Sequence, residues 1–370
     1  MKKYSFLLFF LLLFLNISCA QENKTNINKK TIDYEVIVDN LSNPWGFIFL
    51  PDNSILITEK NGELIHFKDE EKTFIKNLPE ITVLGQGGLM DIELHPDYNK
   101  NGWIYISFVS SIGESRGANT AIMRFKIENN SAINKELLYK ATPNSRRGQH
   151  FGSRLAFDNN NYLYFSIGDR GNRDVNPQDI ERDGGKIYRL HDNGKIPSDN
   201  PFVDNSEAKS AIFSYGHRNP QGMVLNPFTN EIWAHEHGPK GGDEINIIES
   251  GKNYGWPKIS YGINYSGSKF TEHTSLPGME QPLHHWTPSI APSGMVFITS
   301  NIYPNWKGNL LVGSLKFRYL NRCILENNKV IKEEKLLENL GRVRSIEQGP
   351  DGYIYVGIEN VGIVKIYPKK

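Results

Sequence analysis

Cysteine is almost absent from this 370-residue chain, which contains only Cys19 and Cys323. Cys19 ends an apolar N-terminal stretch, so the body of the chain cannot close a disulfide within itself. Stability must come from packing instead, and the roughly 350 residues that remain are ample for a large core without such cross-links. Cys323 stands beside Ile324 and Leu325, and we expect it to be a small core residue.

A strong net charge is also lacking. The 42 Lys and Arg residues and the 41 Asp and Glu residues leave a net charge of +1, and both signs are mixed along the chain. A protein that binds nucleic acid or another generally anionic surface should be markedly basic. We therefore expect no nucleic-acid partner, and any cationic feature must be local.

Long apolar runs are confined to the N-terminus. Residues 1–20 show a basic start, an apolar run at 6–15 and a short small-residue region, which is the pattern of an export signal. The run is too short to span a membrane comfortably. Two outcomes stay open, lipidation of Cys19 or cleavage after Ala20. Lipidation is favoured because residues 21–32 form a polar tether. We expect an exported protein, periplasmic or held at a bacterial outer membrane by this lipid alone.

Helical periodicity with caps is hard to find, which disfavours a parallel α/β sheet. Instead, a turn of Pro, Asp, Asn or Gly followed by a short alternating strand recurs about six times, at spacings of roughly 45 to 75 residues. The strands so marked are 55–58, 103–106, 162–165, 231–234, 309–312 and 353–356. The sequence thus predicts one all-β domain over residues 33–370, a six-bladed β-propeller. Its first strand at 33–38 should pair with its last at 362–367 and close the ring.

The densest group of reactive residues lies at 212–257. A turn places Arg218 and Asn219 where a strand should end, and sites commonly lie in such loops. A second strand runs into residues 235–244, where Gly and Pro turn carbonyls out of the sheet beside several acidic groups. Carbonyls with carboxylates suit a hard cation such as calcium. The alternative is a polar hairpin loop with solvated charges, for which Gly, Pro and Asn alone would suffice.

Four further clusters should meet at one mouth of the propeller, because we expect the loops that follow its inner strands to crowd one face. Their notable side chains are Gln86, His150, Lys316, Arg342 and Arg344. Each cluster alone has a plain interpretation as a tight turn, a structural histidine or solvated cations. Together with Arg218 they form a cationic pocket in a nearly neutral protein, which predicts a small ligand with several negative charges.

These motifs resemble those of the soluble glucose/sorbosone dehydrogenases, also called soluble aldose sugar dehydrogenases. The resemblance runs from residue 41 to residue 352, nearly all of the mature chain. Its most specific motifs are YGHRNPQG at 215–222, EHGP at 236–239 with DEIN at 243–246, and NYGWP at 253–257. The family implies a six-bladed propeller that uses pyrroloquinoline quinone (PQQ) and calcium. PQQ carries three carboxylates, which a pocket of Lys and Arg around a metal should hold.

Position by position, the resemblance makes His150 the general base for the sugar hydroxyl, with Asp169 as its orienting partner. Arg218 would also steady charge on the quinone oxygen. The implied cofactor contacts are Gln86, Arg218, Asn219, Ser289, Lys316, Arg342 and Arg344. The implied metal ligands are the carbonyls of Gly238 and Pro239 at a catalytic calcium, and Glu244 and Tyr254 at a structural calcium. The implied reaction is oxidation of an aldose at its anomeric carbon to a lactone, with electrons passing later to an unknown acceptor.

The sequence leaves several points open. The loops after 171 and 261 are too short to match the substrate and dimer inserts of glucose-oxidising members, so neither the sugar nor a monomer or dimer is predicted. One alternative is a calcium-dependent lactonase-type propeller, which would hold its metal through Glu, Asn and Asp side chains. Another is a non-catalytic sugar-binding propeller lipoprotein. Tight PQQ binding with redox bleaching would separate the dehydrogenase from both.

Overall fold

The computed structural model describes residues 32–369, in which every regular element but one is a β-strand. The exception is the short helix α1 (Tyr98–Asn101). The predicted export signal, Cys19 and the predicted tether lie outside the described residues, apart from Ile32, which begins strand β1. No helix among residues 32–369 is long and apolar enough to cross a membrane.

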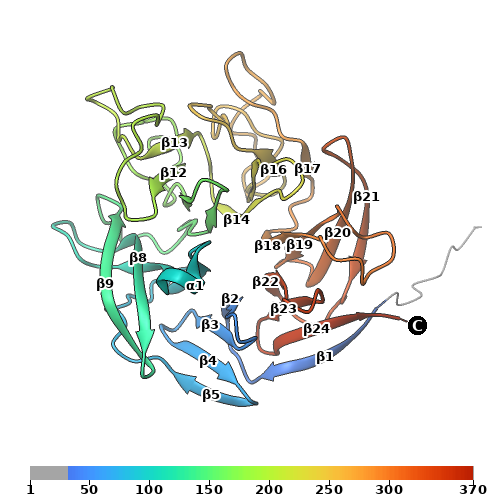
Figure 1. Cartoon of the computed structure of the whole chain (residues 1–370). Helices are drawn as coiled ribbons and strands as arrows, with labels where there is room; N and C mark the ends of the chain where they lie inside the picture. The colour runs from blue at the N-terminus through green and yellow to red at the C-terminus, as the bar shows by residue number, and fades with distance from the viewer. Residues whose placement is uncertain (1–31, 370) are drawn as a thin grey trace, which may run out of the picture.

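The strands form six antiparallel sheets of four, arranged around a central axis (Figure 1). This is the six-bladed β-propeller that the sequence predicts. The blades, each from the axis outwards, are β2 (Pro44–Phe49), β3 (Ile55–Glu59), β4 (Leu64–Lys68) and β5 (Glu71–Phe74); β6 (Leu89–Leu94), β7 (Ile104–Ser110), β8 (Asn119–Glu128) and β9 (Ser131–Lys140); β10 (Leu155–Phe157), β11 (Tyr162–Ile167), β12 (Lys186–His191) and β13 (Ile212–Tyr215); β14 (Pro220–Leu225), β15 (Ile232–Glu236), β16 (Asp243–Ile247) and β17 (His284–Trp286); β18 (Pro292–Phe297), β19 (Leu310–Ser314), β20 (Tyr319–Glu326) and β21 (Lys329–Leu336); and β22 (Val343–Gln348), β23 (Ile354–Ile358), β24 (Gly362–Pro368) and β1 (Ile32–Asp39).

The recurring turn motif joins the innermost strand of each blade to the second strand, so the six marked strands are β3, β7, β11, β15, β19 and β23. Every one of these turns holds a residue in the left-handed region, which Gly and Asn adopt most readily. These residues are Asn53, Gly102, Asn161, Asn230, Gly308 and Gly352. The repeat that the sequence displays is therefore the backbone requirement of one turn, met six times.

The last blade closes the ring as predicted. Strand β1 pairs antiparallel with β24, and the register runs from Ile32 opposite Pro368 to Asp39 opposite Gly362. Three strands from the C-terminal end and one from the N-terminal end thus share a sheet. Strand β24 thus has a ladder partner on each side, β23 and β1.

The core lies between blades. The second strands β3, β7 and β23 are buried along their whole length, because a neighbouring blade covers each of their faces. Outer strands such as β9 and β21 are largely exposed and polar. Cys323 in β20 is fully buried, as expected, and burial raises the pKa of its thiol. The sheets therefore need no covering helices.

Arg154 blocks the central axis. Its guanidinium donates to Asp91 Oδ1 (2.7 Å), to the Gln221 carbonyl (2.6 Å) and to the Arg344 carbonyl (2.9 Å), and it lies 4.3 Å from the ring centroid of Trp45. These partners belong to β6, β14, β22 and β2, the innermost strands of four other blades. One buried side chain thus ties most of the ring together.

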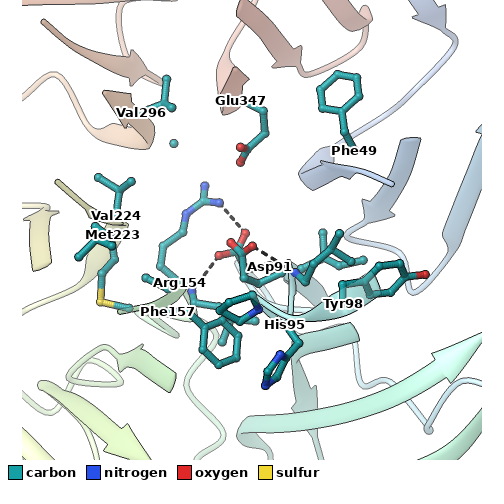
Figure 2. A pocket seen from close by; sticks show the side chains of 18 of the residues that line it. Phe49, Asp91, His95, Tyr98, Arg154, Phe157, Met223, Val224, Val296 and Glu347 are labelled. Carbon is teal, nitrogen blue, oxygen red and sulfur yellow. Dashed lines mark hydrogen bonds and ion pairs between the residues drawn. The ribbon is translucent and has the colours of Figure 1, made fainter. Parts of the chain in front are cut away.

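Below Arg154 lies a cavity of about 560 Å³, the axial chamber, at the end where the innermost strands finish. Figure 2 shows Glu347 pointing into it toward Arg154 and Asp91, with Phe49 and Phe157 on its wall. None of the residues predicted for the functional site lines this chamber. The predicted site must therefore be sought at the opposite mouth.

Candidate active site

Most of the predicted site residues lie in the segments that enter the innermost strands or leave the second strands, and the exceptions are Glu244 in β16 and Tyr254 after it. Those that precede or begin an innermost strand are Gln86, His150, Arg218, Asn219, Ser289, Arg342 and Arg344, and those that follow a second strand are Asp169, Gly238, Pro239 and Lys316. The expectation that the site loops follow the inner strands is wrong. In each antiparallel blade the innermost strand starts at the site face and ends at the axial chamber, so the turns that follow it lie on the other side.

Irregular pairing at the start of the innermost strands shapes this face. The register between the innermost and second strands shifts near the first residues of β2, β6, β14, β18 and β22. Such bulges bend a strand and redirect its side chains. Of the predicted site residues, Arg344 stands at such a bulge.

His150 and Asp169 form a close pair across two adjacent segments of the third blade. His150 Nδ1 lies 2.7 Å from Asp169 Oδ1. The other carboxylate oxygen of Asp169 accepts the indole N–H of Trp256 at 2.9 Å, and the Gly171 N–H donates to Oδ1 at 2.6 Å. Asp169 is 1% exposed, whereas His150 keeps 15% of its side chain accessible. The Nδ1 side of the imidazole is thus fixed by a buried carboxylate, whereas another part of the ring stays accessible.

Burial sets the protonation of this pair. Burial lowers the pKa of His150, the hydrogen bond to Asp169 raises it in part, and the Arg218 charge lowers it again, so the net pKa is below the usual value. For Asp169, burial alone would raise the pKa, but the hydrogen bond and charge of His150 and the charge of Arg218 bring it below normal. An ionised carboxylate only accepts hydrogen bonds, so Nδ1 carries the proton and Nε2 is left as the acceptor.

Two carboxamides predicted as cofactor contacts also hold the loop that carries the histidine. Gln86 Oε1 accepts the His150 N–H at 2.9 Å, and Asn219 Oδ1 accepts the Gly152 N–H at 3.0 Å. The approach is close enough that a Cβ on Gly85 would lie 2.2 Å from the Gly148 carbonyl oxygen. The side-chain NH₂ groups of Gln86 and Asn219 donate to no residue within 32–369 and could therefore bind a ligand.

A cavity of about 390 Å³ opens in front of His150. Its wall includes Asp169, Arg218, Pro239 and Trp256, together with residues of the two inserted loops, Asn172, Arg173, Asp174, Asn264 and Tyr265. Arg173 joins these loops, because its Nη1 donates to Asn264 Oδ1 at 2.8 Å. The structure therefore brings the predicted base, its orienting carboxylate, a guanidinium and the glycine–proline loop around one space.

The glycine–proline loop is shorter than the sequence suggested. His235 and Glu236 end β15, and Asp243 and Glu244 begin β16, so only residues 237–242 are loop. Arg218 Nη1 donates to the carbonyl of Gly238 at 3.1 Å. Asp243 accepts the N–H groups of Gly238 (2.8 Å) and of residues 290 and 291, and thereby joins this loop to the one that carries the buried Ser289.

Glu244 faces a second buried carboxylate. It is the register partner of Glu236, and burial together with the Glu236 charge raises the pKa of Glu244 to about 8. Glu236 accepts His217 Nδ1 at 2.8 Å. The Tyr254 hydroxyl donates to the Ile247 carbonyl and accepts the Glu249 N–H, which leaves the main-chain carbonyl of Tyr254 to serve a cation. Residues 32–369 contain no cluster of three or more His, Cys, Asp or Glu suited to a metal, so carbonyls would have to complete any site here.

The remaining cations form a separate edge on the same face. Lys316 is exposed, and Arg342 Nη1 donates to the neighbouring Leu315 carbonyl at 3.3 Å. Arg342 and Arg344 both bind Glu359, at 2.8 Å and 2.5 Å. None of Lys316, Arg342 and Arg344 lines the cavity in front of His150. Both arginines of the predicted cationic pocket are thus already paired with a carboxylate.

Sequence reasoning missed several residues that complete the site. Glu359 follows β23, outside every motif, and no local pattern marks it. Glu236 and Trp256 stand within quoted motifs, but nothing in the sequence says that one faces Glu244 and the other binds Asp169. Such pairings depend on the strand register within a blade or on contacts between loops, which a sequence motif does not display.

Comparison with known proteins places this geometry in a family. The sequence model described as "Glucose / Sorbosone dehydrogenase" matches residues 41–365. The chain belongs to the glucose/sorbosone dehydrogenase family. Aldose sugar dehydrogenase YliI of Escherichia coli (strain K12) is 41% identical over 334 residues, which cover 88% of this chain and 90% of that protein. This member of the family is accordingly a sugar dehydrogenase, an oxidoreductase.

Two further relatives extend the comparison. Quinoprotein glucose dehydrogenase B of Acinetobacter calcoaceticus is 30% identical over 291 residues, covering 71% of this chain and 60% of that protein. The crystal structure of the soluble aldose sugar dehydrogenase from Escherichia coli in the apo-form matches with a TM-score of 0.87 and 38% identity, and covers 92% of this chain and all of that one. The propeller and its blade count are thus shared with solved sugar dehydrogenases.

Proposed function

We propose that this family member is a quinoprotein that oxidises aldose sugars at the anomeric carbon to lactones, with PQQ and calcium as its cofactors. The observation that carries the proposal is the His150–Asp169 pair at 2.7 Å, with one imidazole nitrogen facing a cavity lined by Arg218. A buried, oriented imidazole with a lowered pKa is a base at neutral pH. A relative at 30% identity is itself named a quinoprotein.

The residues fit PQQ by their charge and by their remaining donors. Arg218 faces the cavity, and Lys316, Arg342 and Arg344 supply three further positive charges against the single carboxylate of Glu359. A guanidinium has five N–H donors, so each arginine keeps donors after it binds Glu359. An anionic ligand would therefore meet charge and donors along one face. When bound, PQQ would supply the hydride acceptor.

The residues also fit calcium. Glu236 and Glu244 are carboxyl groups brought together in a partly buried hairpin, and a cation would stabilise the charged form of both. The carbonyl of Gly238 already accepts from Arg218, but a carbonyl oxygen has two lone pairs and can bind a cation as well. Gly238 and Pro239 would hold the catalytic calcium, and Glu244 with the Tyr254 carbonyl the structural one.

The protein's own part in the reaction follows from the geometry. Nε2 of His150 would take the proton of the anomeric hydroxyl, and Asp169 would stabilise the imidazolium so formed. Trp256 holds Asp169 in place. Arg218 contributes a fixed positive charge at the cavity wall, where negative charge would develop.

The test is reconstitution of the purified protein with PQQ and calcium, followed by absorption spectra before and after addition of a panel of aldoses. We expect stoichiometric PQQ binding that requires calcium, and bleaching of the oxidised cofactor by at least one aldose. Under the same conditions His150→Gln should bind PQQ but lose turnover by roughly 10² to 10⁴-fold. Turnover is expressed per bound PQQ, and the exposed His273→Gln serves as the matched control.

Either of two results would count against the proposal. If the wild type binds no PQQ, the cofactor assignment fails. If His150→Gln stays within about threefold of wild type per bound PQQ, His150 is not the base.

A further inference from the structure

Arg170, the residue after Asp169, is a buried cation that feels the charge of Asp169, but its guanidinium is hydrogen-bonded to no carboxylate of residues 32–369. Its side chain is 1% exposed, and it forms no ion pair with a carboxylate of residues 32–369. Burial lowers the pKa of its guanidinium to about 9. Burying a charge without a counter-ion is costly, so such a residue persists only where other interactions require it.

Those interactions are all with one loop and the strand beside it. The Arg170 guanidinium donates to the carbonyls of Gln149, Arg147 (2.7 Å) and Ala118 (3.4 Å) and lies 3.4 Å from the ring centroid of Phe151. Its main-chain N–H donates to the carbonyl of His150 at 3.3 Å. Arg170 therefore contacts residues on both sides of His150, the proposed base.

The loop needs this support because its backbone is strained. His150 has φ of 56° and Ser153 has φ of 87°, both in the left-handed region that residues with a Cβ avoid. Such conformations persist when the surrounding structure over-determines them. The His150 N–H is fixed by Gln86, but the carbonyls on either side of it are fixed by Arg170.

We propose that Arg170 is a positioning residue for the base: Asp169 orients the imidazole ring of His150, and Arg170 fixes the backbone from which that ring projects. The two neighbouring residues thus hold the two ends of one side chain. This inference rests on the proposed role of His150. It concerns how the protein keeps the Nε2 atom of His150 directed into the cavity. Arg170 itself does not line the cavity and touches no substrate.

The test uses Arg170→Lys and Arg170→Gln in the full chain. Lys keeps the charge but replaces the planar fork by a single donor group, and Gln removes the charge. Arg322→Lys is the control, because Arg322 is also buried, donates to the Asn305 carbonyl (2.7 Å) and lies over the ring of Trp306, but in another blade. Unlike Arg170, it also pairs with a carboxylate, that of Glu334 (2.8 Å).

Two readouts are measured. The first needs no cofactor: the low-field NMR signal of the His150 Nδ1 proton in the hydrogen bond to Asp169, assigned by its absence in His150→Gln. The second is kcat and KM per bound PQQ. We expect both Arg170 variants to weaken or lose the NMR signal and to lower kcat at least about tenfold with KM nearly unchanged, since misplacement of a catalytic group affects mainly the chemical step. Arg170→Lys should retain more of the NMR signal and more of kcat than Arg170→Gln does.

The control variant Arg322→Lys should have a lower melting temperature, but it should keep the NMR signal and the kcat per bound PQQ of the wild type. The proposal is overturned if a folded Arg170 variant keeps the NMR signal at wild-type intensity, or if kcat per bound PQQ falls no further than in Arg322→Lys. If Arg170→Gln fails to fold, the result for Arg170→Lys alone decides whether the proposal stands. If the wild type proves to bind no PQQ, the proposed function fails, but the NMR signal still tests whether Arg170 positions His150.

Discussion

At the scale of single residues, the tuning of His150 gives a directional pH prediction. Asp169 raises the pKa of His150 against the effect of burial. Asp169→Asn should therefore lower that pKa further, so that the acidic limb of kcat/KM moves to lower pH. The maximal rate should fall at the same time, because the ring loses its tautomer and orientation.

The pH profiles of kcat/KM for wild type and Asp169→Asn check this. Asp174→Asn is a suitable control, since Asp174 also lines the cavity but is 79% exposed. A limb that stays in place, or moves to higher pH, would show that Asp169 does not set the protonation of the base.

The cationic edge gives a second residue-scale prediction, a contrast between two variants. Lys316→Ala should leave the melting temperature of the cofactor-free protein unchanged, because no acidic partner of Lys316 is found within residues 32–369. Arg342→Ala should lower it slightly, since it breaks a pair with Glu359. That pair is 44% exposed on the arginine side, so the loss should be about 1 kcal/mol or less.

Both variants should weaken PQQ binding, because each removes a positive charge from the same face. Thermal unfolding without cofactor and a PQQ titration measure the two effects separately. Equal PQQ affinity in wild type and both variants would remove these residues from the cofactor site. An unchanged melting temperature for Arg342→Ala would show that the Glu359 pair adds nothing to stability.

At the scale of elements, the sequence predicts those structural features that depend on residues adjacent in the chain. The turn between the first two strands of each blade requires a left-handed residue, and Asn53 and Gly352 announce such turns directly. The ends of β15 and β16 were not predicted, since His235 and Glu236 resemble loop residues by their polarity. His235 is in fact fully buried between strands. Burial by another blade is not visible in a local pattern.

The same limit applies to the site. Motifs located His150, Asp169 and Arg218, which share a cavity. No motif pointed to Glu359, which reaches Arg344 across 15 residues of chain at 2.5 Å. The sequence predicts the site in the loops that follow the innermost strands, whereas many of its residues lie in the segments that precede those strands. Local motifs identify individual reactive groups, whereas the counter-ion of each group and the face on which it lies depend on strand register and on contacts between loops.

At the scale of the whole molecule, the axial arginine should matter more than any surface charge. Arg154 and Asp91 are 8% and 9% exposed and lie 2.7 Å apart. Arg154→Met would leave Asp91 buried without its partner, and removal of one member of a buried pair costs about 3 to 5 kcal/mol. We expect a large fall in the free energy of unfolding, measured by denaturant.

The double variant Asp91→Asn with Arg154→Met should recover part of this loss, because no unpaired charge then remains. Strictly additive losses in the two single variants and the double variant would show that the pair is not coupled. Loss of PQQ binding without loss of stability would instead give Arg154 a role at the site, through the Arg344 carbonyl that it holds.

The pairing of β1 with β24 also bears on the order in which the protein is made. Residues 40–361 separate β1 from its partner β24, so β1 stays unpaired until all of these residues have been made. Five blades can form from contiguous segments during that time, whereas the sixth cannot. Two exposed carboxylates on β1, Asp33 and Glu35, suit a strand that must wait without pairing to other nascent chains. The ring can therefore close only after the segments of the other five blades have been made.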